Sequence, residues 1–142
     1  MIYIDTSSLL KLFLPDNHSE EVGLAISVES VVIVSALTEL EAYVQIKALH
    51  LGGSFSEAAS VRIRNRMAQS LTDRPFLRRK LDGSVFKTAL GQHEAAASHC
   101  RSLDRLHLAA MQELAATRLM THDLRQAAAA REIGYEVVSP GI

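Results

Sequence analysis

Four acidic residues in this sequence are spaced so that the folded chain could bring them to one site: Asp5, Glu41, Asp104 and Asp123. Asp5 and Asp123 each follow a short apolar run typical of a buried strand, and each is followed by a segment of helical character. In an open parallel sheet, ligands bind outside the carboxyl ends of the strands. Asp5 and Asp123 are therefore predicted to face a shared acidic site.

The third acid, Glu41, lies on a helix predicted from about Ala36 to about Leu51. Apolar residues recur along it at helical spacing and define its predicted inward stripe: Leu37, Leu40, Val44, Ala48 and Leu51. Glu41 falls on that stripe, whereas Glu39 projects to the opposite side and is expected to be solvated. Because a carboxylate on an apolar stripe is costly to bury without a cation or hydrogen bonds, Glu41 is the better candidate.

The fourth acid, Asp104, lies in the first turn of a helix predicted from Ser102 to about Ala116, where the helix dipole favours an anion. The predicted inward stripe of this helix is Leu103, Leu106, Ala110 and Leu114, and Asp104 lies at its border. His107 follows at i+3, where it could hydrogen-bond Asp104 or orient a ligand. A lone histidine on an apolar stripe is more often a satisfied core residue, so His107 is not counted as catalytic.

Simpler roles compete with the shared site. Asp5 and Asp123 stand where helices begin, and aspartate is a favoured N-cap. For Asp5 the neighbouring hydroxyls of Thr6, Ser7 and Ser8 could cap the helix instead. Asp104 taken alone is expected to be a surface residue that stabilises a helix dipole.

Four carboxylates held together would repel one another and raise their pKa values, and no lysine cluster lies beside them in the sequence. A hard divalent cation removes that repulsion, because Mg²⁺ and Mn²⁺ take oxygen ligands. Such a site can bind a phosphodiester and activate water for in-line attack. This prediction depends on all four acids converging.

Strands and helices alternate along the sequence. The run from Val31 to Val34 is entirely β-branched, as expected for a strand covered on both faces. Further strands are expected at 2–4, 118–121 and 136–138, with a possible edge strand around 76–81. The pattern predicts an α/β fold: one domain over residues 1–142, with a central, mostly parallel sheet of four to five short strands flanked by helices.

The composition is that of an ordinary globular protein: 48% hydrophobic and 22% charged residues, with a net charge of -1. The longest apolar runs are far shorter than a membrane span, and no signal-peptide pattern is present. A cytoplasmic location is therefore expected. The single cysteine, Cys100, cannot form an internal disulfide and lacks the paired spacing of a zinc site.

Around the four acids the sequence resembles PIN-domain proteins, specifically the VapC-type toxins of bacterial toxin–antitoxin pairs. The matching segments are Ile4 to Ser7, Ser35 to Glu41, Leu103 to Ala109, Met120 to Asp123, and the tail from Ala130 to Pro140. No single segment is specific, but their order and spacing together are. Residues from Phe55 to about Ser84 contribute least to the resemblance.

The resemblance implies that Asp5, Glu41, Asp104 and Asp123 bind Mg²⁺ or Mn²⁺ for endonucleolytic RNA cleavage. The family glutamate lies three residues after a threonine, which also selects Glu41. Thr6 or Ser7, together with Thr121, would support the metal site. The resemblance further implies a small antitoxin protein, whose tail packs over the active site, and a homodimer.

A basic segment from Arg62 to Lys80 contains one acid, Asp73. Since phosphate neutralisation dominates RNA affinity, we hypothesise that this segment contacts the RNA backbone through Arg62, Arg64, Arg66, Arg78 and Arg79. A solvated helix face, or a docking surface for an acidic antitoxin, explains the same charges equally well.

The favoured function is a metal-dependent endoribonuclease that is the toxin of a type II toxin–antitoxin system. A phosphotransfer domain built on Asp5 is a weaker alternative, because haloacid-dehalogenase-type phosphatases need Asp-x-Asp where this sequence has Asp5-Thr6-Ser7. A catalytically silent PIN module that binds RNA or acts as a scaffold is the other alternative. Degenerate members tend to lose acids, and all four are present here.

Overall fold

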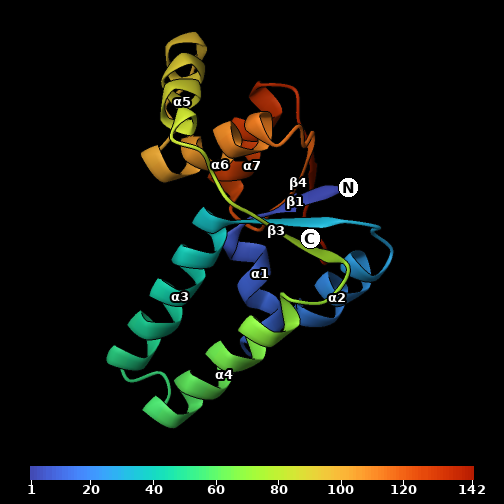
Figure 1. The fold of residues 1–142 in the computed structure, drawn as a ribbon, viewed down its shortest axis with the longest axis vertical. Coiled ribbons are helices and arrows are strands. Elements are labelled where there is room, and N and C mark those ends of the chain that lie inside the picture. Colours follow the sequence, from blue (N-terminus) through green and yellow to red (C-terminus); the bar gives the residue numbers. More distant parts are fainter.

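A computed structural model describes all 142 residues of the chain. Five strands form one sheet in the order β3-β2-β1-β4-β5, and every neighbouring pair is parallel (Figure 1). The strands are β1 Ile2–Ile4, β2 Val32–Ser35, β3 Phe76–Arg79, β4 Arg118–Met120 and β5 Glu136–Val138. The predicted parallel sheet is confirmed, and the possible edge strand forms as β3.

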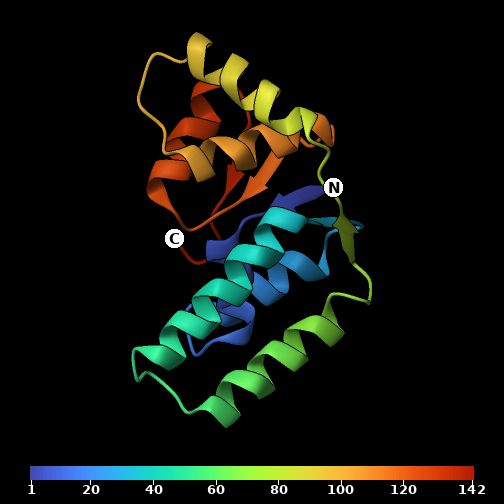
Figure 2. The ribbon, with the colours of Figure 1, turned by 60° about the vertical axis from the view of Figure 1, so that its left-hand side comes forward.

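Seven helices cover both faces of this sheet: α1 Thr6–Phe13, α2 Ser19–Ser27, α3 Ala36–Leu51, α4 Glu57–Ser70, α5 Ser84–Ala95, α6 Ser102–Glu113 and α7 Leu124–Glu132. Helices α1 to α4 lie on one side, and α5 to α7 lie on the other (Figure 2). The arrangement confirms the predicted helices on both faces. None of the helices is both long and apolar enough to cross a membrane.

Alternate side chains of the central strands supply two separate cores. Ile2 and Ile4 of β1 pack with residues of α1 to α4, whereas Tyr3 packs with residues of α5 to α7. Every residue of β1 and β2 is buried. The β-branched run therefore forms the doubly covered central strand that its composition predicts.

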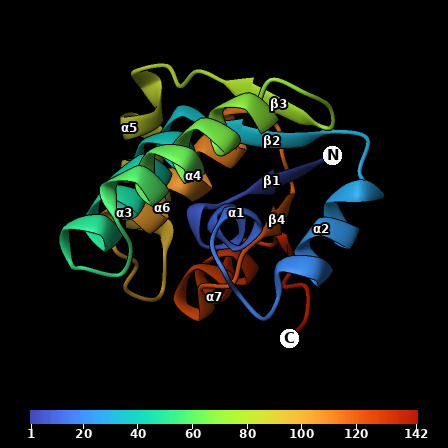
Figure 3. The ribbon, with the colours of Figure 1, turned by 90° about the horizontal axis from the view of Figure 1, so that it is seen from below.

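The predicted inward stripe of α3 is wrong. The buried residues of α3 are Thr38, Ala42 and Ile46, whereas Leu40 and Val44 of the predicted stripe are 61% and 57% exposed. The Thr38 hydroxyl donates to the backbone oxygen of Ile4 (3.1 Å), which turns the face of Thr38, Ala42 and Ile46 toward β1. Seen from below, α3 lies alongside α4 (Figure 3), and Leu40 and Val44 are left on the outer face.

The stripe predicted for α6 is confirmed in part. Ala110 is buried and Leu106 and Leu114 pack against the core, but Leu103 is 49% exposed. The helix instead buries the face that includes His107, Leu108 and Met111. That rotation places His107 against β1 and leaves Asp104 near the solvent boundary.

The burial of α3 predicts unequal costs for two truncations on the same helix. Ile46→Ala should lower the free energy of unfolding by about 2–4 kcal/mol, because it leaves a cavity in a packed core. Val44→Ala should change it by less than about 0.5 kcal/mol in the monomer, because Val44 is mostly exposed within the chain. Urea unfolding of both variants measures the difference. Equal losses, or a larger loss for Val44→Ala, would contradict the observed helix rotation.

Candidate active site

All four predicted acids line one cavity of about 360 Å³. Asp5 follows β1, Asp123 follows the loop after β4, Glu41 lies in the second turn of α3, and Asp104 lies in the first turn of α6. Strands β1 and β4 are paired with Ile4 opposite Met120, so the residues after them leave the sheet at the same level. The structure thus brings together four side chains that the sequence separates by up to 118 positions.

Asp5 is buried and held by three hydrogen-bond donors. Its Oδ1 accepts from the Ser7 hydroxyl (2.7 Å) and from the Ser8 backbone N–H (3.1 Å), and its Oδ2 accepts from the Thr121 hydroxyl. Burial raises the pKa of Asp5 despite these bonds. No cation pairs with this carboxylate, although it lies in the wall of a polar cavity. Ser7 and Thr121, predicted to support the site, both contact it.

Glu41 is held by residues from two other elements. Its Oε1 accepts from the Thr6 hydroxyl (3.2 Å) and is hydrogen-bonded to Nε2 of His107. Partial burial raises the pKa of Glu41, but the hydrogen bonds and charge of His107, with Thr6, outweigh it and lower the pKa overall. Thr6 is therefore a supporting residue of Glu41 rather than of Asp5.

His107 connects the site to the core. Its Nδ1 lies 2.7 Å from the Tyr3 hydroxyl, which lies 2.7 Å from the hydroxyl of Ser35. Burial keeps the pKa of Tyr3 far above its usual value, so the hydroxyl stays protonated near neutral pH. The hydrogen bond to Asp104 that the sequence allowed for His107 does not form, because α6 turns the imidazole inward toward β1 and α3, where it is a buried residue with both ring nitrogens paired. Tyr3 was missed by the sequence pattern, which marks it only as a strand residue.

Glu39 is not freely solvated, contrary to prediction. Its side chain is 16% exposed and forms an ion pair with Arg78 (2.9 Å). Strand β3 ends beside the start of α3, since Arg79 pairs with Ser35, and this brings Arg78 over Glu39. Glu39 lines a separate depression with Arg79 and Lys80, so the two glutamates of α3 serve different surfaces.

Asp104 and Asp123 share one cation that the sequence reasoning missed. The Arg101 guanidinium donates from Nε to Asp104 Oδ2 (2.6 Å) and from Nη2 to Asp123 Oδ2 (2.8 Å). Partial burial raises the pKa of Asp123, but the backbone N–H groups of Gln126 and Arg125, together with Arg101, outweigh it and lower the pKa. The spacing of Arg101 three residues before Asp104 was the only available signal.

Asp5 and Asp123 are also helix N-caps. Asp5 caps α1, and Asp123 caps α7 by accepting from the N–H groups of Arg125 (2.8 Å) and Gln126 (3.1 Å). The capping role therefore coexists with a place in the cavity. Since the cap occupies Oδ1 of Asp123, its Oδ2 is the oxygen directed to Arg101.

The chemistry of these residues fits an oxygen-binding divalent cation. The acids of the cavity offer carboxylate oxygens, which suit Mg²⁺ or Mn²⁺, and buried Asp5 has no counter-cation. As the side chains stand, however, no three acidic, histidine or cysteine groups are close enough together to hold a metal ion. The guanidinium of Arg101 lies between two of the carboxylates, so a metal ion bound to the same oxygens would have to displace it.

The five arginines hypothesised to contact RNA differ in their surroundings. Arg66 donates to the Phe13 backbone oxygen (2.7 Å) and lies over the ring of that residue, and Arg78 is paired with Glu39. These two guanidinium groups have partners within the fold. Arg62, Arg64 and Arg79 form no ion pair.

Comparison with known families identifies the chain. Residues 2–132 match the model of the PIN domain, and the chain therefore belongs to the PIN-domain family. No curated protein matches the sequence significantly.

Solved structures of several bacterial proteins share the fold. They include VapC20 of Mycobacterium tuberculosis, a Sarcin-Ricin loop cleaving toxin (TM-score 0.72, 15% identity, covering 99% of this chain and 100% of that chain). FitAcB of Neisseria gonorrhoeae is similar (TM-score 0.72, 18% identity, 99% and 98% covered). A toxin–antitoxin complex of Klebsiella pneumoniae also matches (TM-score 0.68, 18% identity, 99% and 98% covered).

The raised pKa of Asp5 predicts how stability depends on pH without metal. Above the ordinary aspartate pKa of 3.8 the unfolded chain loses this proton while the folded protein keeps it, so wild-type stability falls as pH rises through the interval up to the folded pKa. Asp5→Asn removes this loss and retains a good N-cap. The variant should therefore gain stability relative to wild type as pH rises.

Urea unfolding in EDTA from about pH 4 to about pH 8 measures this difference. Asp82→Asn, at an exposed carboxylate, is the matched control and should show no such trend. A stability difference between Asp5→Asn and wild type that stays constant with pH would contradict the buried state of Asp5.

Proposed function

We propose that this protein is a metal-dependent endoribonuclease that hydrolyses RNA phosphodiester bonds as the toxin of a type II toxin–antitoxin system. The main support is that Asp5, Glu41, Asp104 and Asp123, from four separate elements of a PIN domain, line one polar cavity. The fold shared with VapC20 and with a toxin–antitoxin complex adds to that support. An RNA substrate also makes the cytoplasm the proposed compartment.

In this proposal the four carboxylates hold Mg²⁺ or Mn²⁺. The bound ion would supply a polarised phosphate and a water of lowered pKa. The other residues keep the carboxylates in place: Ser7 and Thr121 bind both oxygens of Asp5, and Thr6 and His107 bind one oxygen of Glu41. The other oxygen of Glu41 has no hydrogen-bond partner and is the one available to a ligand.

A protein partner is part of the proposal. The outer face of α3 exposes Leu40, Val44 and Leu51, at 61%, 57% and 72%. Apolar residues gathered on one exposed helix face are a common feature of protein interfaces. This surface supports a homodimer, a cognate antitoxin, or both as the partner.

The catalytically silent scaffold has one observation in its favour, namely that the acids do not form a preassembled metal centre. The nuclease and the scaffold differ in what they predict for substitutions of the four carboxylates. In a scaffold, the acids of the cavity would be dispensable for any activity on RNA.

Two glutamates on the same helix provide the direct test of the nuclease proposal. Glu41→Gln should lower the rate of Mn²⁺-dependent RNA cleavage by about 100-fold or more, because even outer partners of metal ligands commonly contribute ten- to a hundredfold. Glu39→Gln, the matched control, should retain the wild-type cleavage rate at saturating RNA, because Glu39 lies beside Arg78 outside the acidic cavity and its loss can alter only RNA binding. Cleavage of a total bacterial RNA pool, followed by sequencing of the cut ends, gives both rates. Equal activity of the two variants would exclude the proposed site.

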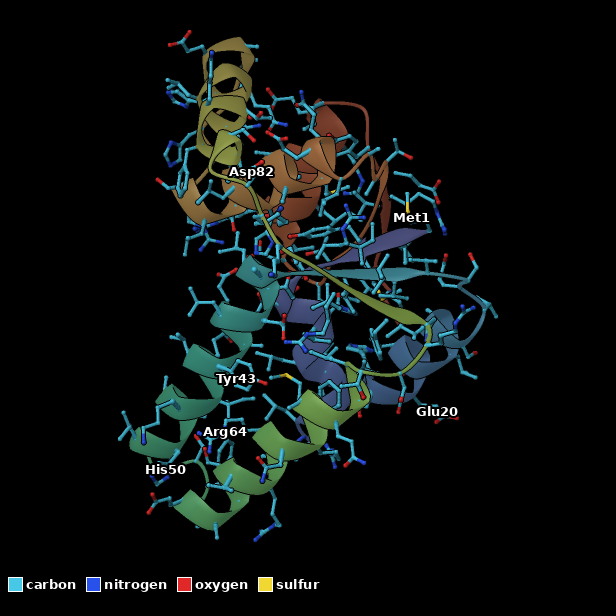
Figure 4. The ribbon with its side chains drawn as sticks, viewed as in Figure 1. Met1, Glu20, Tyr43, His50, Arg64 and Asp82 are labelled. Atoms are coloured by element: carbon cyan, nitrogen blue, oxygen red, sulfur yellow. The ribbon has the colours of Figure 1, made fainter.

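The RNA backbone is proposed to contact Arg79 rather than the arginines of α4. Arg79 lies at the carboxyl edge of the sheet, paired with Ser35, and lines a depression with Lys80. Figure 4 places Arg64 far along the arm formed by α3 and α4, away from the sheet.

Charge reversal separates these two positions. Arg79→Glu should weaken RNA binding and lower the slope of log affinity against log salt by about 0.7 per lost contact with single-stranded RNA. Arg64→Glu carries the same change of charge and should leave the slope unaltered. Fluorescence anisotropy over a salt series measures both. A change of slope for Arg64→Glu alone would move the RNA surface to α4.

A further inference from the structure

Arg101 is the one cation that bridges two acids of the cavity. It is the N-cap residue of α6, its side chain is 50% exposed, and it makes no capping hydrogen bond of its own. Its guanidinium instead joins Asp104 on α6 to Asp123 at the start of α7. The planar fork of an arginine suits this task, because separate N–H groups can bond two carboxylates at once.

The two ion pairs use oxygens that a metal ion would need. Arg101 binds Oδ2 of Asp104 and Oδ2 of Asp123, while Oδ1 of Asp123 is committed to the N-terminus of α7. A cation coordinated by Asp123 must therefore compete with Arg101 for Oδ2. The acids thus line one cavity with Arg101, and not a preassembled metal centre, between two of them.

The surroundings of Arg101 give the side chain room to leave. It lines the acidic cavity and also a neighbouring cavity of about 350 Å³, which Ser98, Cys100 and Arg125 help to form. Because half of the side chain is already exposed, rotating it away disturbs no packed core. The withdrawn guanidinium would remain on the rim of the acidic cavity, since its backbone is fixed at the start of α6.

We propose that Arg101 is an exchangeable internal counter-cation of the acidic site. Without metal it neutralises Asp104 and Asp123. When a divalent ion binds, Arg101 is displaced to the rim, where it binds a phosphate of the RNA. The inference rests on the proposed metal site and adds a residue that couples metal binding to substrate binding. Guanidinium groups bind phosphate through paired N–H donors, so one side chain can serve both states.

The first test measures Mn²⁺ affinity by titration calorimetry, with no RNA present. Arg101→Gln removes the competing charge and should bind Mn²⁺ about fivefold more tightly than wild type, as expected for the loss of two partly exposed ion pairs. Arg101→Lys should fall between them, because a single ammonium cannot reproduce the fork. Arg125→Gln is the matched control: it removes a nearby arginine that forms no ion pair, and should stay within about twofold of wild type.

The outcomes of this titration separate the inference from the proposed function. If wild type binds Mn²⁺ and Arg101→Gln binds it equally well or more weakly, the exchange is overturned while the metal site stands. Failure of wild type and every variant to bind Mn²⁺ would overturn the metal site and the exchange together. If Arg125→Gln raises Mn²⁺ affinity as much as Arg101→Gln does, the effect comes from the overall charge of the protein, and the exchange is again overturned.

The second test measures RNA affinity with and without a divalent ion. Ca²⁺ takes the same oxygen ligands as Mg²⁺, so an RNA oligonucleotide is titrated by anisotropy in Ca²⁺ and in EDTA. Arg101→Gln should weaken RNA binding severalfold more in Ca²⁺ than in EDTA, because in EDTA Arg101 is paired with the acids and only their unbalanced charge opposes the RNA. An equal loss in both conditions would show a fixed RNA contact rather than an exchange.

Discussion

The structure depends on one electrostatic constraint: four carboxylates share a cavity, and each negative charge must be balanced. Asp5 accepts three hydrogen bonds, and burial favours its protonated form. Glu41 is bonded to His107 and Thr6. Asp104 and Asp123 share the guanidinium of Arg101. The repulsion among the four carboxylates is therefore relieved in three different ways. Of these, the ion pairs with Arg101 are the ones that a metal ion can most readily replace.

The parallel sheet makes this crowding possible. Neighbouring strands β1 and β4 end at the same level, and each leads into a helix whose first N–H groups are met by an aspartate. The helix N-termini thereby fix the aspartates and favour their negative charge. Helices α3 and α6 approach from opposite faces of the sheet and bring Glu41 and Asp104. The His107–Tyr3–Ser35 chain of hydrogen bonds ties α6 to β1 and β2 beneath the site.

Much of the fold and of the acidic site could be predicted from the sequence, but the signals behind these predictions differed in reliability. Short-range signals succeeded: β-branched residues identified β2, and Asp5 and Asp123 cap the helices that follow them. Glu41 was chosen correctly over Glu39 as a lining residue of the cavity, yet the stripe used to choose it is exposed to solvent. Helical periodicity shows which residues share a face. It does not show which face meets the sheet, because that depends on contacts such as Thr38 with the Ile4 carbonyl.

The contacts that escaped prediction join residues far apart in the chain. His107 meets Glu41 across 66 positions, and Arg101 meets Asp123 across 22. No local pattern specifies such pairs, since they exist only once the helices have taken their places. The same holds for Arg66 and Arg78, which meet the Phe13 backbone oxygen and Glu39.

The central claim is that the cavity of Asp5, Glu41, Asp104 and Asp123 is a divalent metal site. Anomalous diffraction from crystals grown with Mn²⁺ tests it most directly, because the ion is located by its own signal. The account predicts a manganese peak within this cavity and an Arg101 side chain withdrawn from Asp104 and Asp123. A cavity without a peak in crystals that contain Mn²⁺, with Arg101 still joining the two aspartates, would contradict it.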